Sequence, residues 1–262
     1  MEHANEVNIN TWKLDVDSDH LPEKVFLPTI TEEDAGKVLM AFSDGVWRMK
    51  KFSGVTPTLP YVEETYDSNG NLMDAKLVGR IFIRDSEFNN CDMLKTISIS
   101  SGITSIGNYA FMGCASLSLT SLPSGLTKIG DRAFSMCTNL ALTNLPSELT
   151  NIDWAAFYGC EKLALTSLPS GITSIEENTF YNCKRLSLTS LPSRITSIGT
   201  NAFFNCTNLT SITFEGTPTT IANNAFNGCA NLIAINVPWA EGEVANAPWG
   251  ATNATINYNY VP

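Results

Sequence analysis

The seven cysteines are the residues of this sequence whose chemistry and spacing first suggest a function. Each stands 23 residues after the one before it, at Cys91, Cys114, Cys137, Cys160, Cys183, Cys206 and Cys229. Thiols at fixed intervals can form disulfides or bind a metal ion, but here the count is odd and all seven occupy one position of a repeat. In-register side chains would point alongside each other, even at a coil spacing of about 4.8 Å. We therefore predict free, buried thiols that pack as small apolar side chains.

Other residue types offer little support for catalysis or metal binding. Tetrahedral metal sites need clustered ligands such as C-x-x-C, whereas the two histidines, His3 and His20, lie far upstream of the cysteines. The adjacent acids Glu63–Glu64 and Glu176–Glu177 fit solvated side chains better than a paired acid and base. The sequence contains no G-x-S-x-G motif, no H-E-x-x-H motif and no phosphate-binding glycine loop. We therefore expect no enzyme, no catalytic residues, no cofactor and no metal site.

The composition is that of a folded, acidic protein. The formal net charge is -10, with 16% charged and 44% hydrophobic residues, which argues against disorder. Nucleic acids and anionic membranes are bound by Lys and Arg clusters, so we expect neither as a partner. No stretch approaches the roughly 20 apolar residues of a membrane span, so we expect no membrane insertion. Residues 1–6 lack the order of a signal peptide, which leaves export without one, or prior removal of one, equally open.

The elements that must position the cysteines repeat with them. A phenylalanine precedes each cysteine by three residues, and a leucine follows each by three. A fixed period in this range is typical of a solenoid, in which each coil buries its apolar face against its neighbours. Ile97 and Ile99 alternate, which predicts a short inward-facing strand in each coil, and stacking aligns these strands into a parallel sheet. The segment Ala110-Phe111-x-x-Cys114 predicts a single helical turn, and the phenylalanines predict a stacked ladder in the core.

We divide the chain into three parts. Residues 1–75 form a non-repeat, β-hairpin-rich N-terminal module, residues 76–240 form the solenoid of 23-residue repeats, and residues 241–262 form a C-terminal cap strand. The first repeat carries Glu87 where later repeats carry alanine, which indicates an N-terminal cap. The alternating tail is predicted to close the open end of the sheet, since such edges are usually covered. Trp239 and Trp249 would then be core residues of this cap.

Within the N-terminal module, turn residues predict the local elements. Residues 31–36 predict one capped helical turn that ends at a glycine. Two hairpins are predicted, over residues 37–52 with its turn at Asp44-Gly45 and over residues 61–78. Two prolines mark residues 55–60 as a linker.

Four middle repeats change the strand pattern to Leu-x-Leu-x-x-Leu, which allows two interpretations. Alternation cannot turn Leu119 and Leu122 inward together unless a bulge separates them. In one interpretation Thr120-Ser121 is that bulge, and the equivalent leucines are core. In the other they form an exposed apolar stripe that offers a partner site. The leucines concerned are Leu119, Leu142, Leu165 and Leu188.

In either case, one polar side chain per repeat should project from the sheet face and form the candidate ligand-binding site. These residues are Ser98, Ser121, Asn144, Ser167, Ser190 and Thr213.

The repeat L-x-x-I-x-I-P-x-x-I-T-x-I-G-x-x-A-F-x-x-C, over residues 77–240, resembles the BspA-like, or Treponema pallidum-type, leucine-rich repeat. Residues 244–258 resemble the C-terminal ends of such proteins in gut Firmicutes. The resemblance implies a curved, right-handed leucine-rich-repeat superhelix with short parallel strands. It also implies an extracellular or cell-surface location in a bacterium, and adhesion through binding of a protein or glycan on the concave sheet.

Two other functions remain open from the sequence. Residues 30–39, followed by residues 44–47, resemble segments of prophage tail-associated proteins. That resemblance implies a structural or receptor-binding role, with the N-terminal module as the attachment part. In a third hypothesis the array is only a spacer.

Overall fold

The computed structural model describes residues 37–41, 47–51 and 61–261. The chain divides into two compact units, Met1–Glu63 and Glu64–Pro262. In the first, β1 (Lys37–Ala41) and β2 (Trp47–Lys51) pair antiparallel, which confirms the strands of the first predicted hairpin. Its Asp44-Gly45 turn, the predicted helical turn, the predicted linker and most of the segment that resembles prophage tail proteins lie outside the described residues.

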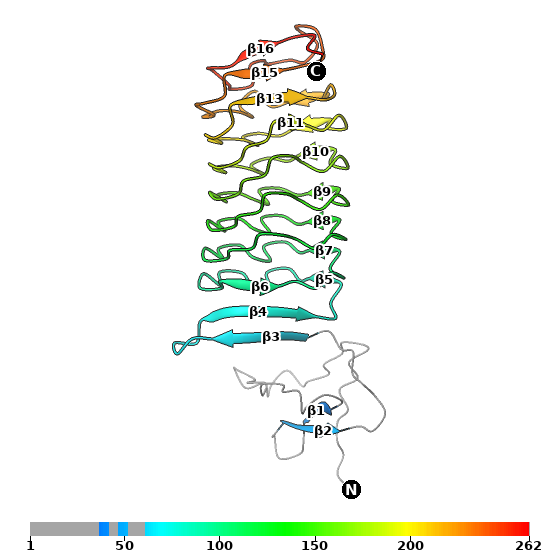
Figure 1. Ribbon diagram of the computed structural model, residues 1–262, viewed down its shortest axis with the longest axis vertical. Coiled ribbons are helices and arrows are strands. Elements are labelled where there is room, and N and C mark those ends of the chain that lie inside the picture. Colours follow the sequence, from blue (N-terminus) through cyan, green and yellow to red (C-terminus); the bar gives the residue numbers. More distant parts are fainter. Residues whose placement is uncertain (1–36, 42–46, 52–60, 262) are drawn as a thin grey trace, which may run out of the picture. The chain divides into compact units, whose positions relative to one another are not determined.

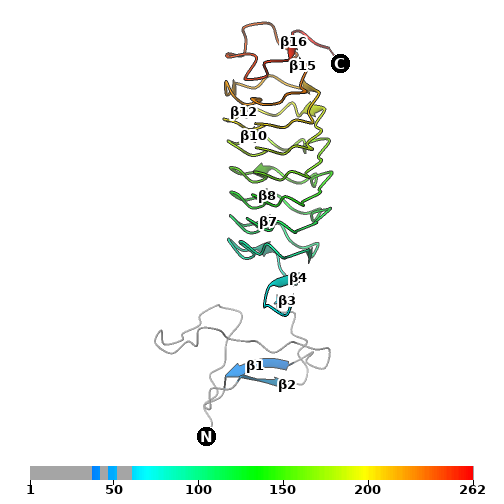
Figure 2. The same cartoon turned by 90° about the vertical axis from the view of Figure 1, so that its left-hand side faces the viewer.

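The second unit is a stack of coils, which confirms the predicted parallel solenoid (Figures 1 and 2). Hydrogen-bonded residues of neighbouring coils are 23 positions apart, as in the pair Ile106 and Ile129. The coils follow a nearly straight axis in both views. No helix in the described part of the chain is long and apolar enough to cross a membrane.

One column of two-residue strands runs along the stack at the Thr-x-Ile segment of each coil. Its strands are β5 (Phe82–Ile83), β7 (Ser105–Ile106), β8 (Lys128–Ile129), β9 (Asn151–Ile152), β10 (Ser174–Ile175), β12 (Ser197–Ile198) and β14 (Thr220–Ile221). They form two sheets, in the orders β5-β7-β8-β9 and β10-β12-β14. In every strand the isoleucine is buried and the residue before it faces outward. The sequence analysis placed these isoleucines in the core but did not predict a strand here.

The second column contains the strands that the sequence does predict, and it lies at both ends of the stack. Near the N-terminal end it contains β3 (Tyr61–Tyr66), β4 (Leu72–Val78) and β6 (Thr96–Ser98). Near the C-terminal end it contains β11 (Ser190–Leu191), β13 (Ser211–Phe214), β15 (Ala234–Asn236) and β16 (Thr255–Asn257). The second predicted hairpin is confirmed as β3 and β4, and β4 pairs in parallel with β6, which lies in the first coil.

The prediction of one continuous sheet is wrong in the middle of this column. Residues 117–122, 140–145 and 163–168 form no strand. In these coils two consecutive side chains face outward between inward leucines, so the backbone cannot keep the two-residue alternation that a ladder requires.

The segment between the phenylalanine and the cysteine is a tight turn, and the predicted helical turn is wrong. The Cys137 N–H donates to the Phe134 carbonyl (3.1 Å), and Met136 has a positive φ of 62°. The Met136 N–H thereby points along the stack and donates to the Tyr158 carbonyl of the next coil (2.7 Å). A helical turn would direct these N–H groups within one coil and leave carbonyls of the next coil unpaired.

The predicted phenylalanine ladder is confirmed in the core. Consecutive rings from Phe88 to Phe226 stack with centroids 5.0–5.8 Å apart and planes within 12° of parallel. Each such pair contributes about 0.5–1.5 kcal/mol beyond the burial of its area.

The cysteines form a second ladder beside the rings. All seven are free, and six, from Cys114 to Cys229, are buried, as predicted. Each of these six donates its thiol hydrogen to the phenylalanine carbonyl of the preceding coil, over 2.9–3.2 Å. Cys91, in the first coil, is only half-buried. Burial raises the pKa of Cys114 and of Cys229 to about 12, from an ordinary value of 9.0.

Both ends of the stack are capped. At the N-terminal end, the Glu87 carboxylate accepts hydrogen bonds from the Arg80 guanidinium and the Arg84 backbone N–H, and the Arg80–Glu87 pair is largely buried. At the C-terminal end, β16 completes the sheet beside β15, as the tail pattern predicts. Trp239 and Trp249 are buried there with edge-to-face rings, which confirms them as core residues.

Candidate binding surface

The six polar residues predicted to project from the sheet face lie one per coil along the stack. Ser98, Ser121, Asn144 and Ser167 are exposed, and Ser190 and Thr213 are half-buried. In the C-terminal sheet, Ser190 lies directly opposite Thr213 in the ladder. The structure therefore places all six in one column that is accessible to solvent.

The buried leucines beneath this column decide between the two interpretations of the middle repeats. Leu142 and Leu165 are fully buried and Leu188 is 2% exposed, whereas Leu119, the first of the four, is partly exposed. The core interpretation is therefore confirmed for three leucines, and the exposed apolar stripe is wrong for them. The bulge that buries them turns two side chains outward in every middle coil.

This bulge adds a threonine column that the sequence analysis did not assign to the site. The exposed threonines are Thr120, Thr143, Thr166 and Thr189. Each precedes one of the predicted polar residues, so the middle coils present four adjacent Thr-Ser or Thr-Asn pairs. We call this set, Thr120–Ser121, Thr143–Asn144, Thr166–Ser167 and Thr189–Ser190, the hydroxyl strip. It contains no charged and no aromatic side chain.

Toward the C-terminal end, the column continues into a chain of side-chain hydrogen bonds. The Asn257 amide donates to Asn236 Oδ1 (2.7 Å), and the Asn236 amide donates to Thr213 Oγ1 (3.1 Å). Asn236 could have been found from the sequence, because it stands 23 residues after Thr213. Asn257 could not, because the period ends after Cys229 and the spacing from Asn236 is 21 residues.

The two strand columns differ in how their hydroxyl groups are used. In the Thr-x-Ile column, the hydroxyls of Thr127 and Thr196 donate to the Thr104 and Thr173 carbonyls, both over 3.0 Å. In the hydroxyl strip, the hydroxyls of Ser121 and Ser167 make no hydrogen bond to any described residue. The strip therefore presents hydroxyls that are free to bind a ligand.

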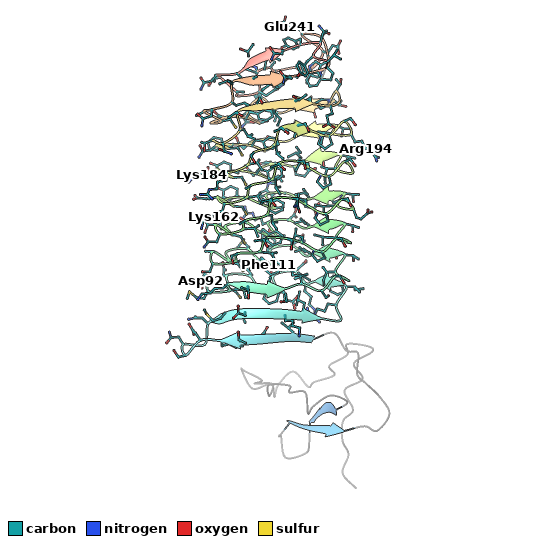
Figure 3. The ribbon with its side chains drawn as sticks, in the orientation of Figure 1. Asp92, Phe111, Lys162, Lys184, Arg194 and Glu241 are labelled. Carbon is teal, nitrogen blue, oxygen red and sulfur yellow. The ribbon has the colours of Figure 1, made fainter. Side chains whose placement is uncertain are left out.

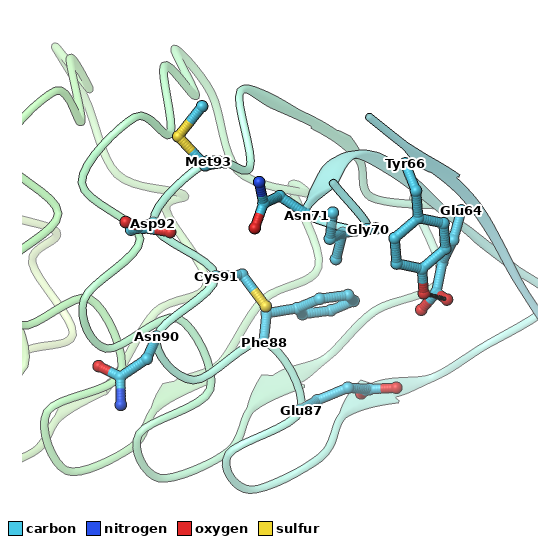
Figure 4. A pocket seen from close by; sticks show the side chains of 11 residues that line it. Glu64, Tyr66, Gly70, Asn71, Glu87, Phe88, Asn90, Cys91, Asp92 and Met93 are labelled. Carbon is cyan, nitrogen blue, oxygen red and sulfur yellow. Dashed lines mark hydrogen bonds between the residues drawn. The ribbon is translucent and has the colours of Figure 1, made fainter. Parts of the chain in front are cut away.

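A pocket of about 360 Å³ lies between the β3–β4 hairpin and the first coil (Figure 4). Its walls include Glu64, Tyr66, Cys91 and Asp92. The hydrogen bond from the Tyr66 hydroxyl to Glu64, followed by burial, raises the pKa of Tyr66 to about 12. Burial, followed by the nearby Glu64 and Asp92 charges, raises the pKa of the Cys91 thiol. Both groups therefore hold their protons at neutral pH, and neither is an activated nucleophile.

Metal ligands are also not brought together. Within the described residues, no three side chains of His, Cys, Asp or Glu are arranged so that they could hold a metal ion. Of the surfaces described above, the hydroxyl strip is the one whose free donors and acceptors lie side by side in successive coils.

The repeat defines the class of this protein. Six copies of the BspA type leucine rich repeat region match residues 81–190 and 173–246, which together are well over half of the chain. The chain belongs to the BspA-type leucine-rich-repeat family, as the sequence resemblance indicates. No curated protein gives a significant match.

Several solved structures of bacterial leucine-rich-repeat proteins are similar to this chain. A leucine rich cell surface protein of Faecalibacterium prausnitzii is 23% identical, with a TM-score of 0.46 and coverage of 77% of this chain and 69% of that one. The leucine-rich-repeat protein of T. pallidum is 22% identical, with a TM-score of 0.37 and coverage of 76% and 79%. The pneumococcal vaccine antigen PcpA is 16% identical, with a TM-score of 0.45 and coverage of 73% and 69%.

Proposed function

We propose that this protein is a non-catalytic, adhesin-like binding protein of a bacterial cell surface that holds a protein or glycan partner on the hydroxyl strip. The observation that carries the proposal is the row of outward Thr-Ser and Thr-Asn pairs, whose hydroxyls at Ser121 and Ser167 are not used by the fold. A cell-surface location is supported by membership of the BspA-type family.

The physical basis of binding is preorganisation. The strip is held by fully buried leucines, by the stacked rings and by hydrogen bonds between coils. Polar side chains on such a rigid surface lose little conformational entropy when a partner binds. Free hydroxyl and amide groups in a regular row can bind the hydroxyls of a sugar or the main chain of a protein.

The test compares two triple variants of the whole chain on an array of glycans and immobilised extracellular-matrix proteins. The first variant, Ser121→Ala with Asn144→Ala and Ser167→Ala, removes the strip's polar groups in three consecutive coils. The control, Ser105→Ala with Asn151→Ala and Ser174→Ala, removes outward polar groups of the same types from the Thr-x-Ile column.

We expect the strip variant to lose at least tenfold in affinity for each partner that the unchanged protein binds, and the control to stay within about twofold. Equal binding by all three proteins would show that the strip is not the binding surface. A loss confined to the control would assign binding to the other column of strands.

A further inference from the structure

The basic residues of the repeats are unevenly distributed. Residues 91–262 contain seven Lys and Arg residues against ten Asp and Glu residues. Three of the seven, Lys162, Lys184 and Arg185, follow the cysteines of two consecutive coils and are all exposed. Figure 3 shows Lys162 and Lys184 at one edge of the stack and Arg194 at the opposite edge. We call the three residues the basic corner.

The charges of the basic corner are only partly neutralised. Lys184 Nζ lies 2.7 Å from Glu161 Oε1, and Lys162 Nζ donates to the neutral Asn139 amide oxygen over 2.6 Å. The guanidinium of Arg185 has no partner among the described residues. One acid thus faces three cations, which leaves a local excess of two positive charges on a protein with a net charge of -10.

Lys162 and Arg185 also depart from the structural use of their repeat position. Other coils have asparagine at this position, and its amide donates to a backbone carbonyl of the preceding coil. These bonds are made by Asn139 to Ala115 (2.8 Å), Asn208 to Arg185 (3.5 Å) and Asn231 to Thr207 (2.7 Å). Lys162 and Arg185 make no such bond, so two adjacent coils give up an inter-coil hydrogen bond and expose like charges instead. Such an arrangement is unfavourable for the fold alone, because stacked like charges repel.

The surroundings of the basic corner favour a saccharide over a peptide. Thr166 and Ser167 of the hydroxyl strip follow Lys162 within five residues along the same coil. Within the described part of the chain, no exposed large hydrophobic residue lies between residues 160 and 206. Tight protein interfaces depend on apolar and aromatic anchors, whereas hydroxyl groups next to cations suit an acidic, polyhydroxylated ligand.

We propose that the basic corner binds the acidic groups of an anionic polysaccharide while the adjacent hydroxyl strip binds its sugar hydroxyls. The inference rests on the function proposed above and specifies its ligand class. Uronate carboxylates and sulfate esters share the chemistry that Lys and Arg recognise.

The experiment measures binding of the full chain to four probes, at 50 and 300 mM NaCl. Heparin carries sulfate esters and carboxylates, polygalacturonate carries carboxylates only, dextran is neutral and poly-glutamate is an acidic peptide. The variant Lys162→Asn with Arg185→Asn introduces the residue that the same position has in neighbouring coils, so the coil should fold. The control, Lys95→Asn with Arg194→Asn, removes the same charge elsewhere, and circular dichroism checks both folds.

We expect the unchanged protein to bind heparin, polygalacturonate or both, more weakly at the higher salt concentration. The basic-corner variant should lose at least tenfold in affinity and the control less than twofold. Heparin binding without polygalacturonate binding would assign the site to sulfate, and binding of both would assign it to carboxylate as well.

Three outcomes would overturn the inference: no binding to either acidic polysaccharide, binding of poly-glutamate as tight as that of the polysaccharides, or equal losses in both variants. Its failure is separable from failure of the proposed function. A partner whose binding is lost in the Ser121, Asn144 and Ser167 variant but unchanged in the Lys162 and Arg185 variant would uphold the strip and reject the basic corner.

Discussion

Raising the pH from 8 to 10 should destabilise the solenoid steeply, because unfolding releases protons from its buried thiols. Burial raises the pKa of Cys114 and of Cys229 to about 12, and it raises the pKa of Cys137, Cys183 and Cys206 well above the ordinary value of 9.0. The folded state therefore keeps protons that the unfolded state loses. The stability from each thiol is fully present below pH 9 and is lost as the pH rises toward the folded pKa.

The size of the effect follows from the number of buried thiols. A thiol with an unfolded pKa of 9.0 that stays protonated when folded costs about 1.4 kcal/mol of stability by pH 10. Six such thiols, from Cys114 to Cys229, together remove about 8 kcal/mol between pH 8 and pH 10. That loss is comparable to the whole stability of an ordinary domain, which is about 5–15 kcal/mol.

The assay is urea unfolding at pH 8, 9 and 10 in the presence of a phosphine reductant, followed by circular dichroism. Tyrosine ionisation also contributes, so the comparison of variants isolates the thiols. Cys160→Ala lowers stability at every pH, but its loss between pH 8 and 10 should be smaller than that of the unchanged protein by about 1.4 kcal/mol. Cys91→Ala, at the half-buried thiol, should alter the pH dependence less. An unfolding midpoint that is constant from pH 8 to 10, or an unaltered pH dependence in Cys160→Ala, would refute the reasoning.

Three further substitutions test the packing by the same unfolding assay. Phe157→Ala breaks ring stacks of 5.6 and 5.8 Å on both sides and should cost about 3–5 kcal/mol; a cost below about 1 kcal/mol would show that the ladder adds little. Leu165→Ala should cost about 2–5 kcal/mol and Leu119→Ala clearly less, because only Leu165 is fully buried; equal costs would contradict the bulge. Glu87→Ala leaves the buried Arg80 guanidinium without its carboxylate and should cost about 3–5 kcal/mol. Adding Arg80→Met should recover most of that loss, and an additive double variant would show that the two side chains are not coupled.

The sequence predicts the ladders of this fold because one residue type recurs at one position. Phe134 and Cys137 are flanked by the same residue types 23 positions before and after them, so like side chains must meet like in any equal stack of coils. Pattern reasoning fails where the backbone, not the side chain, decides the structure. The Ser105–Ile106 strand is only two residues long, too short for an alternation to be visible in the sequence.

A signal for the tight turns is nevertheless present. The residue before the cysteine is glycine or asparagine in six of seven repeats, as in Gly113 and Asn182. These residue types tolerate the left-handed conformation best, and Met136 adopts it where neither is present.

The candidate site is predictable in part for a related reason. The outward position of Ser121 follows from its place between two core leucines, but the outward turn of Thr120 depends on the bulge chosen by the backbone. Lys162 and Arg185 are missed because they are isolated along the chain. They become neighbours only when one coil is laid on the next, and a search for basic runs cannot reveal them.

The hydrogen bonds between coils nearly all join residues 22 to 26 positions apart, and this has a consequence for how such a protein can change in length. A duplication or deletion of one whole repeat within its gene would create a junction chemically equivalent to those already present. The two ends, built from Glu87 with Arg80 and from the paired tryptophans, would be untouched by such an event. The reach of the outer surface can therefore vary between descendants of one ancestor by recombination alone, without new contacts having to evolve.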